Sequence, residues 1–354
     1  MRRALLDVLA CPACRSPVEV IDSHAETDVR ILKGTLRCIA CWRRYPIDGG
    51  VPRLVTEVAE DVADVCRRYS FQWLSRWNGK FECVRCYGFH DDVYIGWVKS
   101  QLECRRAAAP SDWMLDAGCG SGEKAAVLAR LSPAQNVVGI DLGVEPLEKA
   151  AAKFGDMPNL DYVRGDILEP PFKERAFAYG MSLGVLHHTP DTRRAFASFR
   201  RLLTERTTCL LWIYPTYREA PEWRMPYLAR DVLTLGRGYR VPTGVLRLLA
   251  HTIVITFYPW VDLFFTMSYR RIGRDLPFFA VDQMTRKERY QCQVFFCFDT
   301  LLPRYQWRHT VAEIERWFAE EGLDPILHAH SFHVASSEPP TRSLGRQAAS
   351  SSGE

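Results

Sequence analysis

Short apolar runs alternate with amphipathic helical patterns between residues 111 and 215. Helical periodicity at about Glu123–Leu131 separates the first two runs. The apolar runs predict strands at Trp113–Leu115, Val137–Ile140, about Leu160–Val163, Tyr179–Leu183 and Cys209–Tyr214. Strands that alternate with helices in this way predict an α/β fold on a doubly wound, Rossmann-like parallel sheet.

The segments around this region follow other patterns. Residues 1–55 form a small cysteine-bearing unit, and residues 56–110 are mostly helical and aromatic, which predicts a linker or lid. The segment 216–308 is long, apolar and basic, and it is followed by a short segment with a helix and a strand. Its helix is predicted near Val311–Glu321, where Thr310 and Glu313 can form a capping box. Residues 336–354 are rich in Ser, Pro, Gly and Arg, so we expect a disordered tail.

Composition narrows the class of protein without naming a function. The 354 residues are 47% hydrophobic and 25% charged, which excludes a wholly disordered chain, a collagen-like fibre and a coiled coil. The formal charge of +4 is too small to require nucleic acid. Near the N-terminus Asp7 interrupts a very short apolar run, and no small-residue cleavage site follows. We therefore expect a cytoplasmic protein.

Four of the cysteines form two knuckles, Cys11-Pro-Ala-Cys14 and Cys38-Ile-Ala-Cys41. Two such pairs supply a closed tetrahedral site of four thiolates, which favours structural Zn²⁺ and leaves no position for water or substrate. A rubredoxin-like iron site and redox-active thiols are the alternatives.

A second pair, Cys83 and Cys86, lies between the single cysteines Cys66 and Cys104. These flanking residues form no second knuckle. We expect ordinary cysteines of a helical region here rather than a second metal site.

The residues around the two knuckles also resemble a known family. CPAC, the strand-like ILKGTLRC and a CxxC followed by Tyr45-Pro46-Ile47 and Gly50-Val51-Pro52 resemble the zinc-ribbon family of small methyltransferase activators. Members of that family are partners of tRNA and protein methyltransferases. The resemblance spans roughly residues 5–55 and implies a zinc ribbon there.

A glycine turn lies at the centre of the chain. The first predicted strand runs into Asp116, then Gly118, Gly120 and Gly122, and then a helix. Glycines let the backbone turn sharply and let a ligand approach it, and the helix start offers free N–H groups. By itself this loop also fits a dinucleotide site.

With Asp141 and Asp166 at the next strand ends and GVLHHTPD after the fourth strand, the series resembles class I S-adenosylmethionine-dependent methyltransferases. The resemblance is to the broad group that includes quinone-biosynthesis enzymes, covers about residues 111–215, and implies a seven-stranded sheet. It implies that the backbone of Gly118, Cys119 and Gly120 cradles the methionine part of the cofactor, with Asp116 beneath.

The same resemblance assigns the adenosine end. Asp141 would hold both ribose hydroxyls, and Asp166 would bond the adenine amino group. Leu142 and Ile167 would pack on the two faces of adenine, and Leu183 would line the floor beneath the sulfonium. The alternative is a doubly wound fold that binds another nucleotide or none.

The segment after the fourth strand, Ser182–His188, bears on the methyl acceptor. It lacks the Asp/Asn-Pro-Pro-aromatic motif of amino-methylating enzymes and the Pro-Cys nucleophile used on pyrimidine C5, which favours oxygen or carbon of a small molecule. His187 and His188 are expected to line the site, with His188 a candidate catalytic residue. His309 and Tyr305 are predicted to re-enter beside the site. His309 is the candidate general base, the alternative being a partner for the helix start or for cap packing.

The segment 216–308 predicts a helical cap, because it precedes a helix that starts on the cofactor side of the sheet. It holds 14 Arg/Lys against 8 Asp/Glu, a net +6. Its apolar centre, Leu248–Tyr269, is broken by His251, Pro259 and Asp262 and makes a poor transmembrane span. We expect helices that wall a pocket. The alternative is a cap that takes a hydrophobic, prenylated or phosphorylated substrate, or rests on a membrane surface.

These features predict a methyltransferase that uses S-adenosylmethionine on oxygen or carbon of a small, hydrophobic metabolite, with a structural zinc ribbon. The alternative is an RNA or protein methyltransferase that docks through the ribbon. Residues 1–55 hold only 9 Arg/Lys against 6 Asp/Glu, which argues against nucleic acid. A third hypothesis, a degenerate fold acting as a binding partner, is disfavoured by the intact acidic and glycine positions.

Overall fold

The computed structural model describes residues 1–27, 30–77, 90–221, 240–274 and 281–338, with the single residues 224, 228, 230, 232, 276 and 278. The predicted second cysteine pair, Cys83 and Cys86, lies outside the described residues, as does the segment 339–354.

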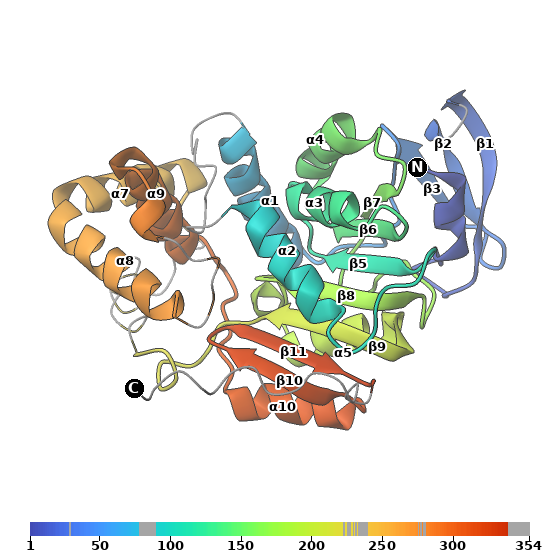
Figure 1. Ribbon diagram of the computed structural model, residues 1–354. Coiled ribbons are helices and arrows are strands. Elements are labelled where there is room, and N and C mark those ends of the chain that lie inside the picture. The colour runs from blue at the N-terminus through green and yellow to red at the C-terminus, as the bar shows by residue number, and fades with distance from the viewer. Residues whose placement is uncertain are drawn as a thin grey trace.

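A seven-stranded sheet forms the centre of the molecule, in the order β10–β11–β9–β8–β5–β6–β7 (Figure 1). Strands β5 to β9 pair in parallel, and β11 runs antiparallel to both β9 and β10. The bounds are β5 (Trp113–Ala117), β6 (Asn136–Asp141), β7 (Leu160–Arg164), β8 (Phe177–Leu183), β9 (Leu203–Trp212), β10 (Asp324–Ala329) and β11 (Phe332–Ser336). The prediction of a doubly wound, seven-stranded sheet is confirmed, although its antiparallel edge is the two-stranded hairpin β10–β11 rather than one strand.

Helices cover both faces of this sheet. The first face carries α2 (Asp91–Leu102), α3 (Glu123–Leu131) and α4 (Val144–Phe154), and the second carries α5 (Thr192–Leu202) and α10 (Val311–Glu320) (Figure 1). A short 3-10 helix, η2 (Leu186–His188), follows β8. The predicted capping box between Thr310 and Glu313 is present at the start of α10.

Buried polar residues explain two differences between the predicted and the observed boundaries. β9 begins at Leu203, before the predicted Cys209, because Thr207 and Thr208 are buried with their hydroxyls bonded to Ala178 O and Ser336 Oγ. The predicted tail also starts too early. Ser336 belongs to β11, and the buried Glu338 accepts hydrogen bonds from Arg206 at 2.7 and 3.0 Å.

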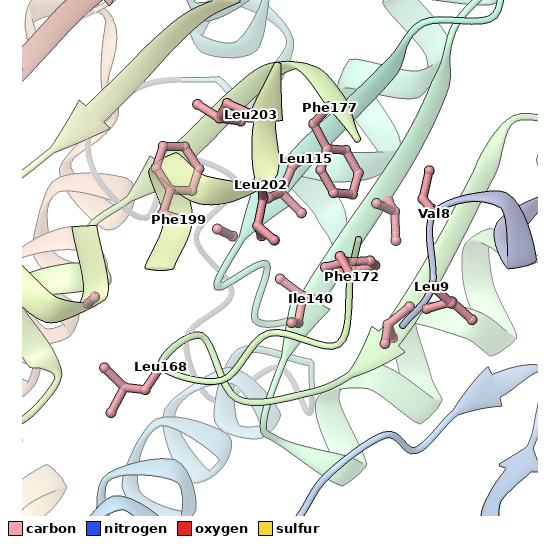
Figure 2. Packing of buried hydrophobic residues seen from close by; sticks show 14 of the residues in the cluster. Val8, Leu9, Leu115, Ile140, Leu168, Phe172, Phe177, Phe199, Leu202 and Leu203 are labelled. Atoms are coloured by element: carbon pink, nitrogen blue, oxygen red, sulfur yellow. The ribbon is translucent and has the colours of Figure 1, made fainter. Parts of the chain in front are cut away.

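The N-terminal unit is a four-stranded antiparallel sheet that packs against the central one. It comprises η1 (Arg3–Asp7), β1 (Val18–Glu26), β2 (Ile31–Cys38), β3 (Arg44–Asp48) and β4 (Val51–Pro52). Val8 and Leu9 share one buried cluster with Phe172 and Ile140 of the α/β region (Figure 2). The two sheets are therefore joined by a continuous hydrophobic core.

Helix α1 (Glu60–Trp77) lies between the central sheet and the described part of the predicted cap (Figure 1). The cap contains α7 (Thr243–Thr256), α8 (Tyr258–Ile272), η5 (Val281–Gln283) and α9 (Arg286–Leu301). Its own hydrophobic cluster also takes in Tyr69 and Phe71 of α1. Among the described residues no single helix is long and apolar enough to cross a bilayer, whereas α7 and α8 together meet those criteria but bend by 94°.

Candidate functional site

A cavity opens at the carboxyl ends of β5, β6 and β8, where an open α/β sheet binds its ligands. Its empty volume, with the open mouth included, is about 1270 Å³. Its lining runs from the glycine turn after β5 to His188 and Tyr214, so the same cavity reaches the ends of β5 and β6 and the segment after β8.

The glycine turn after β5 forms one wall of this cavity. Gly118 has φ +85°, and a Cβ there would lie 2.3 Å from the Val185 side chain. Gly120 has φ +54°, and a Cβ there would lie 2.7 Å from the Trp73 indole of α1. Both positions therefore require glycine, and the main chain from Gly118 to Cys119 lines the cavity directly.

Asp141 lies at the end of β6 and lines the same cavity. Its carboxylate accepts hydrogen bonds from Gly120 N at 2.8 Å and from Gly143 N at 2.9 Å. Burial raises the pKa of this carboxyl, and the two backbone donors oppose that shift. Each oxygen keeps a lone pair for another donor, which suits a pair of neighbouring hydroxyls.

Asp116 lies beneath the glycine turn and is buried. Within the described part of the chain, its Oδ2 has no hydrogen-bond partner. Burial raises the pKa of Asp116 to about 7, opposed by the charge of Lys124. A buried carboxylate oxygen without a donor is costly, and a ligand ammonium would satisfy it. The residues present therefore fit the amino acid end of S-adenosylmethionine.

Asp166 also lines the cavity, together with Leu142 and Ile167. Its Oδ1 accepts from Leu168 N at 2.8 Å, and burial raises its pKa. Apolar side chains on either side of a polar acceptor suit a flat heteroaromatic ring such as adenine. The structure thus brings the predicted cofactor residues together around one cavity. Gly120 contributes through its bond to Asp141.

His188 also lines the cavity, with its ring 5.6 Å from that of Tyr214. Its Nδ1 lies 2.8 Å from the carbonyl oxygen of Tyr305. Because a carbonyl only accepts, Nδ1 carries the proton. Burial lowers the pKa of His188 to about 4, so the ring is neutral and its Nε2 presents a lone pair.

Two further predicted catalytic residues lie elsewhere. His309 is not among the cavity-lining residues. Its ring packs edge-on against Trp317 of α10, with centroids 4.8 Å apart, because its backbone is bonded to Tyr214 next to the start of that helix. The Tyr305 hydroxyl donates to Asp61 of α1 at 2.5 Å, and Tyr305 is not among the cavity-lining residues. Only its carbonyl serves the site, through His188.

Sequence reasoning missed the residues that α1 and α9 bring to the cavity. Tyr69 and Trp73 come from α1, and Asp299 comes from α9. Asp299 is buried and accepts from Gln72 Nε2 at 2.8 Å and from the Tyr214 hydroxyl at 3.2 Å. Burial raises its pKa. A signal was present in the sequence, since Asp299 is an acidic residue within the apolar run VFFCFDTLL.

The four cysteines of the N-terminal unit form a second candidate site. Their sulfur atoms all lie within 4.8 Å of one another. Cys11 and Cys41 are 3.6 Å apart, and Cys14 and Cys38 are 3.4 Å apart. These separations are too long for disulfides and fit the edges of a tetrahedron around one metal ion.

Two family models match this chain on the segments just described. Residues 115–211 match the methyltransferase domain family, and residues 2–50 match the Trm112p-like protein family. The chain contains a class I methyltransferase domain behind a Trm112-like domain. Both resemblances predicted from the sequence are therefore confirmed.

Curated relatives of the methyltransferase domain include quinone and O-methyltransferases. The chain is 30% identical over 129 residues to 2-phytyl-1,4-naphtoquinone methyltransferase of Thermosynechococcus vestitus, over 35% of this chain and 57% of the relative. It is 33% identical to demethylmenaquinone methyltransferase of Staphylococcus aureus over 29% and 44%, and 26% identical to O-methyltransferase cnsE of Penicillium expansum over 48% and 59%. The chain spans 59% or less of the length of each of these relatives.

Two of the solved structures that match this chain are more distantly similar to it. The Bacillus subtilis YcgJ protein gives a TM-score of 0.38 at 18% identity, covering 66% of this chain and 68% of that one. A complex between the Haloferax volcanii Trm112 methyltransferase activator and a methyltransferase gives 0.44 at 12% identity, covering 78% and 98%.

Proposed function

We propose that this chain is an S-adenosylmethionine-dependent methyltransferase that methylates oxygen or carbon of a small, hydrophobic metabolite. One observation carries the proposal. A single cavity joins an acidic, glycine-walled end that suits the cofactor to an aromatic end where His188, Tyr214 and Asp299 meet. When bound, S-adenosylmethionine supplies an electrophilic methyl group on its sulfonium.

The cofactor end works by binding and orientation. Asp141 would accept from the ribose hydroxyls, and Asp116 from the ammonium of the amino acid end. Leu183 at the end of β8 lines the same cavity and would lie beneath the methyl group. Fixing the methyl group in line with an acceptor supplies much of the catalysis in a displacement of this kind.

The acceptor end can take up a proton. The lone pair of His188 Nε2 and the carboxylate of Asp299 are the two acceptors there. Burial raises the pKa of Asp299, which strengthens that carboxylate as a base, and lowers the pKa of His188 to about 4, which weakens the imidazole as a base. A hydroxyl or an acidic C–H of the acceptor would lie between them.

The walls of the acceptor end favour a small, apolar molecule over a polymer. Tyr69 and Trp212 line it with aromatic surface, and α1 and α9 flank it. The Trm112-like domain lies against β7, beyond the adenosine end, where Leu54 N donates to Arg164 O at 3.0 Å. We propose that its four thiolates hold a structural Zn²⁺ and that it supports the adjoining domain rather than gathering RNA or protein.

Calorimetry with S-adenosylhomocysteine on the full chain tests the cofactor site. Asp141→Ala removes the acceptor of both ribose hydroxyls, so affinity should fall at least about a hundredfold. Zinc content should stay unchanged, because the four cysteines lie elsewhere. The exposed Asp156 offers a matched control, and Asp156→Ala should bind like the wild type.

Failure of the wild-type protein to bind S-adenosylhomocysteine would overturn the proposal. Equal affinity in Asp141→Ala would overturn the assignment of the site.

A further inference from the structure

The outer face of the cap is apolar. From Thr243 to Tyr269 every exposed residue is uncharged. Trp260 is 73% exposed, although a surface helix of a globular protein normally turns its polar side to water. We call this surface the α7–α8 face, and its large side chains are Val245, Leu248, Ile255, Phe257, Trp260, Leu263 and Met267.

From Thr243 to Tyr269 the two charged side chains and the one histidine pack against α1 or α9. Arg247 lies over the Phe71 ring of α1, 5.4 Å from its centre. Asp262 accepts from Gln293 of α9 at 2.6 Å, and Arg289 of α9 lies 3.8 Å from it. His251 Nδ1 lies 3.1 Å from the Tyr290 hydroxyl, also on α9. The usual polarity of a helix pair at a protein surface is therefore reversed.

Exposed arginines stand at both ends of the α7–α8 face. Arg240 precedes α7, and Arg270, Arg271 and Arg274 stand at the end of α8. Arg270 is held by Asp282 at 2.7 Å. An apolar surface bracketed by cations complements a layer of anionic headgroups over acyl chains.

The shape of the helix pair suits the surface of a bilayer rather than its interior. The 94° bend separates α7 from α8, and Phe257 and Trp260 lie at that bend. Aromatic side chains are favoured at the level of the headgroups. Figure 1 shows α7, α8 and α9 at the end of the molecule opposite the Trm112-like domain.

We propose that the α7–α8 face docks on an anionic membrane surface. The proposal rests on the proposed function, and it specifies the acceptor as a molecule dissolved in the bilayer. Val254 and Phe265 of the cap share one buried cluster with Phe298, which neighbours Asp299 at the acceptor end. One buried cluster of the cap therefore lies between the α7–α8 face and the acceptor end of the cavity.

Flotation of the full chain with vesicles tests the proposal. One set contains phosphatidylcholine alone, and the other contains phosphatidylcholine with phosphatidylglycerol. The wild type should float with the anionic set, and the double variant W260E/L263E should lose at least about tenfold in bound fraction. Val93→Glu is the matched control, because Val93 is an exposed apolar residue on α2, and it should float like the wild type.

In the flotation experiment, equal flotation of W260E/L263E and wild type, or no flotation of either, overturns the proposal. So does light scattering that shows a wild-type dimer lost in the variant without vesicle binding, since a second copy would then cover the face. Calorimetry with S-adenosylhomocysteine should be unaffected by the variant. Vesicle binding without that affinity would contradict the proposed function and leave the docking surface standing.

Discussion

Single residues set the chemistry of the cavity through burial. Asp116 and Asp299 are both carboxyls whose pKa is raised by burial, whereas His188 is kept neutral by the same cause. The sequence identified Asp116 because it follows an apolar run and precedes glycines. It could not rank His188 above His309. The position of the His188 ring depends on the carbonyl of Tyr305, 117 residues away, and the position of the His309 ring depends on its packing at the start of α10.

Asp116 makes the ligand-free protein sensitive to pH. Its pKa rises from 3.8 to about 7 on folding, so between these values the folded protein keeps a proton that the unfolded chain has released. Stability should therefore fall as pH rises through this range. Asp116→Asn should remove that loss and raise stability at pH 8 by on the order of 2 kcal/mol, while weakening S-adenosylhomocysteine binding.

Thermal unfolding of the wild type and Asp116→Asn at pH 5 and pH 8, without ligand, measures this effect. Asp156→Asn serves as the exposed control. Parallel pH profiles for the wild type and Asp116→Asn would contradict the assignment.

At the scale of elements, local pattern predicted the strands and their tips. The apolar runs placed β5 to β8 within a few residues, and Asp116, Asp141 and Asp166 at the ends of the first three runs marked the cofactor end. The contributions of α1 and α9 were not predictable in this way. Tyr69 and Asp299 are 230 positions apart by their residue numbers, and only the packing of the cap against α1 brings them to one cavity.

The four-cysteine unit should depend on its metal. Cys38 accepts N–H groups from Ala40 and Cys41 at 3.4 Å each, so its sulfur organises the second knuckle. Cys38→Ser should lower bound zinc and destabilise the domain by several kcal/mol, since metal binding and folding are coupled there. Elemental analysis and thermal unfolding measure both, with Cys104→Ser as a control outside the cluster. A metal-free variant of full stability would exclude a structural role for zinc.

For the whole molecule, a buried ion network joins the two domains. The Asp161 side chain on β7 is fully buried. It meets Arg2 at 2.7 Å and Arg30 at 3.1 Å. Sequence patterns could not predict how the two domains pack against each other, because these contacts join residues more than 130 positions apart. The shared hydrophobic cluster of Figure 2 has the same long-range origin.

Removing this carboxylate should loosen the Trm112-like domain. Asp161→Asn leaves two guanidinium groups without their counter-ion, which costs about 3–5 kcal/mol for a buried pair. Asp48→Asn breaks a half-exposed pair with Arg53 and should cost less than about 1 kcal/mol. Urea unfolding of both variants compares them, and similar losses would show that the Asp161 network is not what joins the domains.

The bond from Leu54 to Arg164 has a consequence for association with other proteins. The rim of a sheet ordinarily offers unpaired amides and carbonyls as a template for a foreign strand. Here the polypeptide lays its own backbone along part of β7. A strand of another protein that sought the same rim would have to displace this tethered segment, so that part of β7 is closed to edge-to-edge pairing.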